Sequence, residues 1–175
     1  MKEIPFEQLN GNAAELIGKQ WMLITAGTPD AGNCNMMTAS WGGLGFLWNR
    51  PVAYVFVRPN RHTRPLIDAQ ESFTLSFMPE RYRDELMFCG RNSGRDCDKF
   101  EQTSLQALCL PSGLTAMQDA DIVLECRKMY VQAMEEKCFL DYSEVSPRYY
   151  GEGSGEELHL LYIAEISHCY LRGES

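Results

Sequence analysis

Four residues near the middle of the chain combine positive charge, an imidazole and a hydroxyl within six positions: Arg58, Arg61, His62 and Thr63. They follow the apolar run 52–57 and precede a short predicted helix, so they lie where a strand ends and a helix begins. Helix starts and arginine side chains both bind anions. The spacing predicts a phosphate site, although solvent-exposed arginines with Thr63 as a helix cap explain it equally well.

A second segment, residues 35–41, reads Asn-Met-Met-Thr-Ala-Ser-Trp and ends at Gly42-Gly43, where the backbone can bend or allow a close approach. Its hydroxyls and terminal N–H groups suit a flat polar ligand. The same alternation is typical of any half-buried strand, in which a tryptophan more often belongs to the core. The pattern alone therefore favours a structural role. The residues that would contact a ligand are Asn35, Met37, Thr38, Ala39, Ser40 and Trp41.

The acidic residues are unevenly distributed. Residues 31–67 contain no Asp or Glu, whereas an even spread of 24 carboxylates over 175 residues predicts roughly five. The same window contains Arg50, Arg58, Arg61 and Arg64. Exclusion of carboxylates from buried strands explains the missing acids but not the clustered arginines. The segment is therefore a candidate site for a small anion in an otherwise acidic protein.

The totals restrict the class of protein. A chain of 175 residues that is 45% hydrophobic and 23% charged is typical of one globular domain, which we place at 1–175. The net charge of −8 argues against nucleic acid or an anionic membrane surface as a partner. We see neither a signal peptide nor an apolar run of about 20 residues, so we expect a cytoplasmic protein without a membrane span.

Seven cysteines without a Cys-x-x-Cys pair are expected to be reduced thiols, and no spacing suggests a zinc site. The chain also lacks a Gly-x-Gly-x-x-Gly dinucleotide fingerprint, a Walker loop and a Gly-x-Ser-x-Gly elbow. Lys99 follows a polar loop that includes Ser93, and it is either a surface lysine or a second cation for a ligand. His159 lies in an apolar run and is expected to be a core histidine, with a ring contact as the alternative.

The elements that must position these residues are mostly strands. We expect strands at 21–26, 35–41, 52–57, 72–77, 122–134 and from 158 toward 170. We expect short helices at 13–18, 63–69 and 80–89, and a helical turn at 99–101. Residues 44–49 are expected to be an apolar connector, 137–142 to pair with the strand from 122, and 146–155 to be a loop. Without a regular βαβ alternation, this order predicts a mostly antiparallel barrel with helices outside it.

Four blocks in this order, at 35–41, 58–63, 73–77 and 93–100, resemble the flavin reductase-like, FMN-binding split-barrel family, and most closely its flavoredoxin-like subgroup. The resemblance implies a mainly β Greek-key split β-barrel with a few short peripheral helices. It also implies non-covalent FMN and a homodimer with the flavin near the subunit interface. Met36-Met37 departs from the family in being bulkier than the small or hydroxyl residues often found there.

The same resemblance implies a map of the cofactor site. The segment 35–41 would line the isoalloxazine ring, the segment 58–63 would take the phosphate end, and Lys99 would also reach the flavin. The expected cofactor contacts are Asn35, Met37, Thr38, Ala39, Ser40, Trp41, Arg58, Arg61, His62, Thr63, Ser93 and Lys99. No side chain is expected to be catalytic in the strict sense, because a flavin moves electrons and hydrides itself.

Three functions are compatible with these residues and with the resemblance. The first is a reductase that uses NADH or NADPH as co-substrate to reduce FMN or a downstream acceptor. The alternative is a flavoredoxin-type electron carrier with tightly bound FMN, reduced by a redox partner protein without direct NAD(P)H oxidation. The third is a barrel that stores a flavin or haem without redox work.

Overall fold

The computed structural model of the chain describes residues 1–29, 33–151 and 157–173. Part of the turn-rich segment 27–33, which we expect to join the strands at 21–26 and 35–41, and residues 152–155 of the predicted loop at 146–155 lie outside the described residues. The strands are β1 (Lys2–Ile4), β2 (Met22–Ala26), β3 (Asn35–Ala39), β4 (Gly42–Leu47), β5 (Arg50–Val57), β6 (Ser72–Phe77), β7 (Ala107–Cys109), β8 (Thr115–Met117), β9 (Ile122–Ala133) and β10 (Leu160–Leu171).

The α-helices are α1 (Thr63–Ala69), α2 (Arg83–Arg91), α3 (Lys99–Gln102) and α4 (Tyr142–Tyr149). A π-helical segment spans Ala14–Gln20, and 3₁₀ turns span Phe6–Gln8, Glu80–Tyr82 and Glu136–Cys138. Within the described ranges, none of these helices has the length and apolar character needed to cross a lipid bilayer.

One antiparallel sheet forms the body of the molecule, in the order β3-β2-β6-β9-β10-β5-β4, with β1 added beside β10. The strands curve around a common core but the sheet does not close, because β3 and β4 remain its two edges. These two edge strands are consecutive in the chain and are joined only by Ser40 and Trp41. We call this junction the seam. The predicted mainly β split barrel is confirmed.

Two hydrophobic clusters lie on the two faces of the sheet. The inner cluster is built from alternate residues of the central strands, such as Ile24, Leu75, Leu124 and Tyr162, all fully buried. The outer cluster lies beneath α2 and the β7–β8 hairpin and includes Met36. Since neighbouring residues of a strand point to opposite faces, β3 contributes Met37 and Ala39 to the inner cluster while Met36 joins the outer one.

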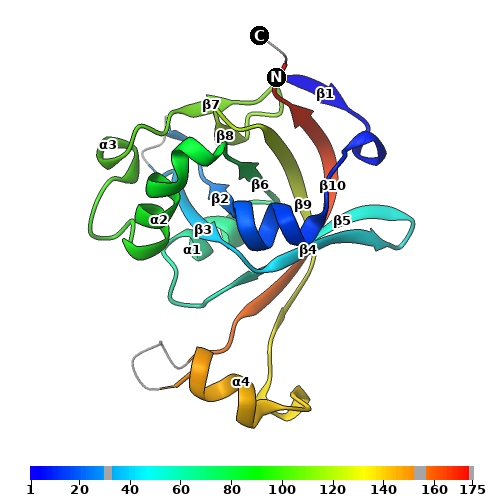
Figure 1. Cartoon of the computed structure of the whole chain (residues 1–175), viewed down its shortest axis with the longest axis vertical. Coiled ribbons are helices and arrows are strands. Elements are labelled where there is room, and N and C mark those ends of the chain that lie inside the picture. Colours follow the sequence, from blue (N-terminus) through cyan, green and yellow to red (C-terminus); the bar gives the residue numbers. More distant parts are fainter. Residues whose placement is uncertain (30–32, 152–156, 174–175) are drawn as a thin grey trace.

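The strands β9 and β10 are the longest, at 12 residues each, and they extend past the rest of the sheet. Figure 1 shows α4 at the end of this extension, away from β1 and the last residues of β10, which pair at the opposite end. We call residues 134–151 the arm. The pairing of β9 with β10 carries register shifts at Ile163/Ala164 and Ile166/His168, and such bulges bend and twist the long strands.

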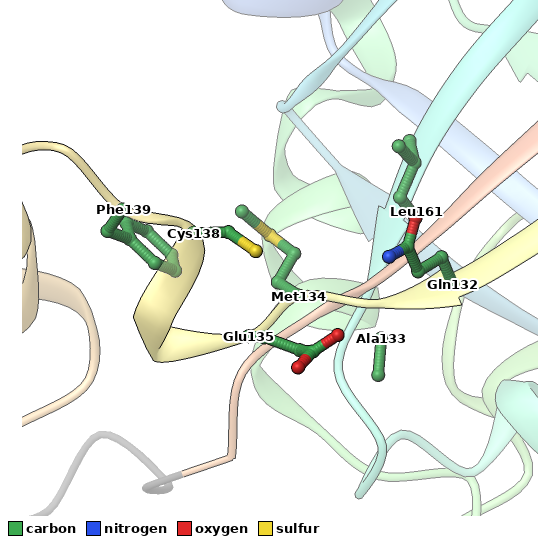
Figure 2. A pocket seen from close by; sticks show the side chains of 7 residues that line it. All are labelled: Gln132, Ala133, Met134, Glu135, Cys138, Phe139 and Leu161. Carbon is green, nitrogen blue, oxygen red and sulfur yellow. The ribbon is translucent and has the colours of Figure 1, made fainter.

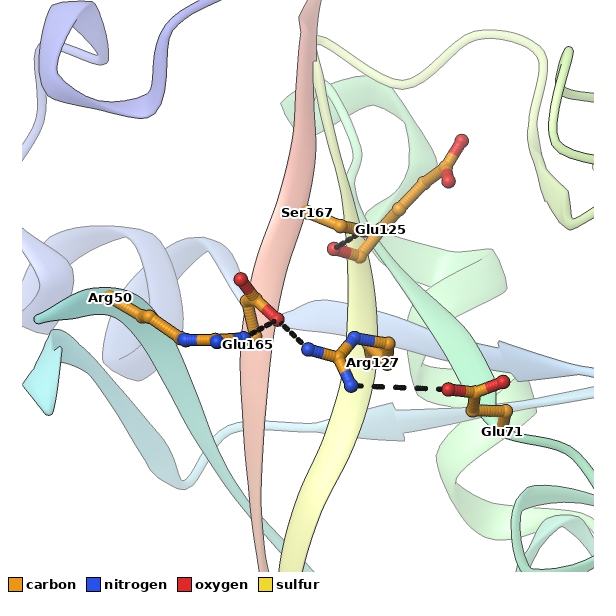
Figure 3. A network of polar contacts seen from close by, with 6 residues as sticks. All are labelled: Arg50, Glu71, Glu125, Arg127, Glu165 and Ser167. Carbon is orange, nitrogen blue, oxygen red and sulfur yellow. Dashed lines mark hydrogen bonds and ion pairs between the residues drawn. The ribbon is translucent and has the colours of Figure 1, made fainter. Parts of the chain in front are cut away.

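A charged network crosses the sheet where β5, β9 and β10 lie side by side (Figure 3). Glu165 of β10 accepts hydrogen bonds from Arg127 and from Arg50, whose Nη1 lies 2.9 Å from its carboxylate. Arg127 also reaches Glu71, at 3.9 Å. Burial alone would raise the pKa of Glu165, but the hydrogen bonds and charges of the two arginines outweigh it and lower this pKa. Charge pairs of this kind secure the register of neighbouring strands.

Four expectations about elements were wrong. Residues 44–49 are not a connector, because β4 pairs with β5 through a two-residue turn at Trp48 and Asn49, which both have positive φ. Residues 137–142 do not pair with β9 but contain a 3₁₀ turn, and the predicted loop from 146 begins inside α4. Thr63 is not a helix cap: it is the first residue of α1, and it is buried.

Candidate functional site

Two adjoining cavities lie beside the seam. The first, the seam pocket, has a volume of about 250 Å³ and is lined by Met37, Thr38, Ala39, Ser40, Trp41, Phe56, Arg58, Arg61 and His159. The second, the loop pocket, has a volume of about 260 Å³ and is lined by Asn35, Met37, Asn60, Arg61, His62, Thr63, Arg91, Asn92, Ser93, Gly94, Arg95 and Lys99. Because Met37 and Arg61 line both, the two cavities form one elongated site.

All the residues selected from the sequence line one of these two pockets. The strand residues from Thr38 to Trp41 lie in the seam pocket, whereas His62, Thr63, Ser93 and Lys99 lie in the loop pocket. The fold therefore brings together segments from three separate parts of the chain. Their role as cofactor contacts remains a prediction.

The bend at the seam depends on Gly42. Its φ of +155° and the position of its backbone would place an added Cβ 2.5 Å from the carbonyl oxygen of Tyr54, so a larger residue does not fit. This close approach lets the chain leave β3, pass Ser40 and Trp41, and enter β4. As a result, the side chain of Trp41 is 41% exposed at the pocket instead of lying in the core.

Several polar side chains of the site are held by the surrounding fold. The hydroxyl of Thr38 donates to the carbonyl of Leu86 in α2, at 2.5 Å, which leaves it only as an acceptor toward a ligand. The amide of Asn35 donates to the hydroxyl of Thr63, at 2.8 Å, and so ties β3 to the start of α1. The backbone of Gly94 packs against Asn35 so closely that a Cβ there would lie 2.5 Å from its amide oxygen.

The loop pocket contains two cations that are removed from solvent. Lys99 is only 4% exposed, and its ammonium donates to the carbonyls of Met36 and Cys89, each at 2.8 Å. Arg61 donates to the carbonyl of Gly90, at 3.0 Å. Burial lowers the pKa of both side chains, Arg58 lowers that of Arg61 further, and Arg61 adds to the lowering for Lys99. Lys99 thus has two of its three donors engaged and lies beside Arg61.

Neither pocket has an Asp or Glu among the described residues that line it. The carboxylates that form ion pairs in the described ranges bind arginines and lysines elsewhere, such as Arg64, Arg127 and Arg172. Concentrated positive charge without a nearby carboxylate favours an anionic ligand, and arginine adds hydrogen bonds suited to phosphate. The seven residues of α1 are too short for a helix dipole to carry this effect, so the side-chain cations supply it.

An aromatic group closes the other end of the site. The ring of Trp41 lies 5.1 Å from those of Tyr149 and His159, between centroids. His159 and Tyr150 are both buried, and the Tyr150 hydroxyl lies 2.9 Å from Nδ1 of His159. Burial, together with the charges of Arg58 and Arg61, lowers the pKa of His159 from 6.5 to about 4, so this imidazole is neutral at neutral pH. His159 is thus the buried histidine that the sequence predicted, and contact of its imidazole with a ligand ring stays a prediction.

Sequence reasoning missed other lining residues, namely Phe56, Asn60, Arg91, Asn92, Gly94, Arg95, Tyr149 and Tyr150. The polar loop that contains Ser93 was a usable signal for Arg91 and Arg95, since it is rich in cations and turn residues. Phe56 is hidden in a strand that is apolar on both faces, and the tyrosines belong to the arm, which had been interpreted as a loop. The residues around Phe56 and around the two tyrosines in the sequence give no indication that these side chains lie beside the seam.

Comparison with known proteins identifies the family. The flavin reductase like domain matches residues 15–175. The chain belongs to this family. No curated protein matches it. The family supports a redox function that involves a flavin, and its split-barrel fold agrees with the open antiparallel sheet described above.

Solved structures show the same fold at low identity. Flavoredoxin from Methanosarcina acetivorans superposes with a TM-score of 0.66 at 18% identity, over 87% of this chain and 68% of that one. An FMN-binding domain of a flavin reductase-like enzyme from Shewanella baltica gives 0.68 at 16%, over 97% and 76%. An NADH:FAD oxidoreductase from Streptomyces globisporus, in complex with NAD and FAD fragments, gives 0.64 at 13%, over 87% and 74%.

Proposed function

We propose that this protein is a flavin-dependent oxidoreductase that holds FMN non-covalently across the seam pocket and the loop pocket, and that takes electrons from NADH or NADPH. The observation that carries the proposal is the shape and charge of the joined site. One end has aromatic walls, and the other has Arg61 and Lys99 without a carboxylate among the described lining residues. A flavin mononucleotide has the same asymmetry, with a flat ring at one end and a phosphate at the other.

In this arrangement, each pocket holds one end of the cofactor. Trp41, Ser40 and Met37 of the seam pocket would hold the ring, whereas Arg61 and Lys99 of the loop pocket would bind the phosphate. Thr63, His62, Asn35 and Ser93 would complete the phosphate end. The bulk of Met36 does not oppose this fit, because it is buried in the outer cluster, away from the pockets.

When bound, the flavin would supply the hydride and electron transfer. The chain itself binds, orients and shields. Trp41 and His159 exclude water from one end, and the ammonium of Lys99 fixes α3 against β3 through the carbonyl of Met36. Because these groups are held by the fold before a ligand arrives, little of the binding free energy is lost in ordering them.

The alternative is an electron carrier of the flavoredoxin type, with FMN held tightly and reduced by a partner protein. Two observations favour considering it. The fold superposes on a flavoredoxin as well as on an NADH:FAD oxidoreductase, and the chain lacks a recognisable dinucleotide motif. The carrier and the reductase would use the same flavin site, so only the source of electrons separates them.

We also propose that the protein is a homodimer, as the family resemblance implied. Phe46 and Trp48, at the tip of the β4–β5 hairpin, are 65% and 63% exposed, and apolar groups of this size are typical of protein interfaces. Light scattering of the purified protein measures its mass directly, and a mass near 20 kDa would contradict this proposal.

A visible absorption spectrum tests the function. We expect the purified protein, or the protein supplied with FMN, to show flavin absorption. Under anaerobic conditions, addition of NADH or NADPH should bleach this absorption within milliseconds to seconds if the protein is a reductase. Bound FMN that neither nucleotide bleaches, but that dithionite does, would identify a carrier. A protein that binds no FMN under any of these conditions would refute both functions.

A further inference from the structure

A third cavity adjoins the seam pocket on the side of the arm. We call it the aromatic chamber; its volume is about 350 Å³, and it is lined by Trp41, Phe56, Met134, Phe139, Val145, Tyr149, Tyr150 and His159. It shares Trp41, Phe56 and His159 with the seam pocket. A ligand in the chamber would therefore lie directly beside whatever the seam pocket holds.

The arm forms the outer wall of this chamber. Val145 and Tyr149 are four residues apart in α4 and so lie on one face of the helix. The arm is attached to the body beside the seam: Arg58 Nη2 donates to the carbonyl of Tyr149, at 2.8 Å, and the guanidinium of Arg58 lies 5.7 Å from the ring of Tyr150. These contacts hold α4 over the chamber.

The other end of the chamber meets an outer pocket on the arm. Figure 2 shows Met134 between the two strands and Cys138 of the 3₁₀ turn at Glu136–Cys138, with Phe139 on the other side of that turn. Both residues line the outer pocket as well as the chamber. Phe139 also meets the ring of Tyr150 edge to face, at 6.3 Å between centroids. The chamber is therefore bounded by rings on several sides.

The lining determines which ligand chemistry fits. None of the lining side chains carries a charge at neutral pH, because His159 is neutral there. The polar groups are few, and the Tyr150–His159 pair has hydrogen-bonding capacity left over, since a hydroxyl can make more than one hydrogen bond. A volume of about 350 Å³ is at the lower end of small-molecule sites. It suits a single ring, not a dinucleotide.

We propose that the aromatic chamber binds a single uncharged aromatic ring that carries a hydroxyl or carbonyl group, and that it holds this ring next to the flavin. This proposal rests on the proposed function, because it names the class of second ligand that the same site accepts. The ring would pack between Trp41, Phe56 and Tyr149, and its oxygen would bond to Tyr150 or His159.

The first test fills the chamber. The probe is 4-ethylphenol, titrated calorimetrically into FMN-loaded protein at about pH 7. Val145→Trp adds bulk inside the chamber, so it should weaken probe binding by roughly tenfold or more. The affinity for FMN should change less than about twofold, because Val145 lines neither FMN pocket. The control is Leu140→Trp, which adds a tryptophan to the same arm at a fully exposed position and should change neither affinity.

The second test removes one hydroxyl. Tyr150→Phe should weaken 4-ethylphenol by roughly threefold to tenfold, the effect of one hydrogen bond. Binding of ethylbenzene, which lacks the oxygen, should be unchanged. Equal losses for the two probes would mean that Tyr150 only shapes the chamber.

Other outcomes would overturn the proposal. The first is that 4-ethylphenol does not bind the wild-type protein, and the second is that it binds Val145→Trp as tightly as the wild type. The third is that a native dimer becomes monomeric in Val145→Trp, which would show that a second copy of the chain covers the chamber. Failure of the proposed function is distinguishable, because FMN binding is measured in the same samples. If FMN does not bind, 4-ethylphenol is titrated into the protein as purified. The comparison of its affinity for Val145→Trp and for Leu140→Trp still shows whether the chamber binds the ring.

Discussion

Arg61 is the residue at which the seam pocket and the loop pocket meet, and its charge is half removed from water. Its guanidinium is anchored to the carbonyl of Gly90, so it does not need to be ordered by a ligand. Arg64, three residues later, forms an ion pair with Asp68 at 2.9 Å and lines neither pocket. The two arginines therefore provide a matched comparison of a site cation with a surface cation.

Arg61→Ala should weaken FMN binding by roughly tenfold to a hundredfold, because hydrogen bonds to charged groups contribute about 1.5–3 kcal/mol. Binding of riboflavin, which has no phosphate, should change far less. Fluorescence titration of both flavins measures the two affinities, with Arg64→Ala as the control that alters neither. Equal weakening of FMN and riboflavin would place Arg61 away from the phosphate.

His159 gives the site a dependence on pH. Its pKa is lowered to about 4 in the folded protein by burial and by Arg58 and Arg61, whereas the ordinary value is 6.5. Between these values the unfolded chain binds the proton and the folded chain does not. Its contribution to stability is therefore present above about pH 6.5 and is lost as the pH falls toward 4.

We expect the free energy of unfolding, measured with urea, to decrease between about pH 7 and about pH 5. His159→Gln should show a smaller decrease over the same interval, because it removes the group that titrates. The control is His168→Gln, at an exposed position, which should show the wild-type decrease. The same slope in wild type and His159→Gln would show that other groups produce it.

The seam is the element at which the sheet opens onto the proposed flavin site. In the described part of the chain, β3 and β4 are the two edges of the sheet and do not pair with each other. Ser40 and Trp41, which join them, therefore line a cavity at the place where a closed barrel would have backbone hydrogen bonds between strands. The bend requires Gly42, whose position leaves no room for a Cβ. Gly18 offers a matched control, because a Cβ there would have no neighbour within 4 Å.

Gly42→Ala should lower the free energy of unfolding by about 1–3 kcal/mol, the usual cost of a strained backbone position. It should also weaken FMN binding, because Trp41 and Ser40 would shift. Gly18→Ala should be neutral, or stabilising by up to about 1 kcal/mol, since alanine is the better helix former. Urea denaturation of both variants gives the comparison, and a Gly42→Ala protein as stable as Gly18→Ala would contradict it.

The arm is the second element that decides function. It is built from the ends of β9 and β10 and from α4, and it brings Tyr149 and Tyr150 to the seam from more than 90 residues farther along the chain. It meets the body through Arg58 and through ring contacts of Tyr149 with Trp41 and of Tyr150 with His159, whereas the strands that carry it are paired along their length. The arm thus adds a wall to the site without belonging to either of the two hydrophobic clusters.

At the scale of the whole molecule, charge is segregated. The chain carries a net charge of −8, yet the described lining of the seam pocket and the loop pocket contains arginines and a lysine and no carboxylate. Such a field attracts a small anion to the pocket while the rest of the surface repels nucleic acid. The site also draws residues from β3, from the link between β5 and α1, from the loop between α2 and α3, and from the start of β10.

Because a bound ligand would connect these distant segments, we expect FMN to stabilise the whole domain. At about 100 times its dissociation constant, a ligand specific for the folded state adds about 2.7 kcal/mol to the free energy of unfolding. A melting scan with increasing FMN should show a rising midpoint, and Trp41→Ala should reduce the shift for FMN and riboflavin alike. Unchanged midpoints at every concentration would contradict binding to the native state.

The sequence by itself determined the family, the mainly β class and the segments that line the seam pocket and the loop pocket. These features are local in the sequence. They are the alternation of apolar and polar residues in β6, the cluster of cations at 58–63 and the turn residues around Ser93. Only the tertiary structure decided where β4 pairs, that Thr63 bonds to Asn35 and does not cap a helix, and that the arm reaches Trp41. Contacts of this kind depend on which distant backbone a segment meets, and that is a property of the folded sheet, which no short window of residues encodes.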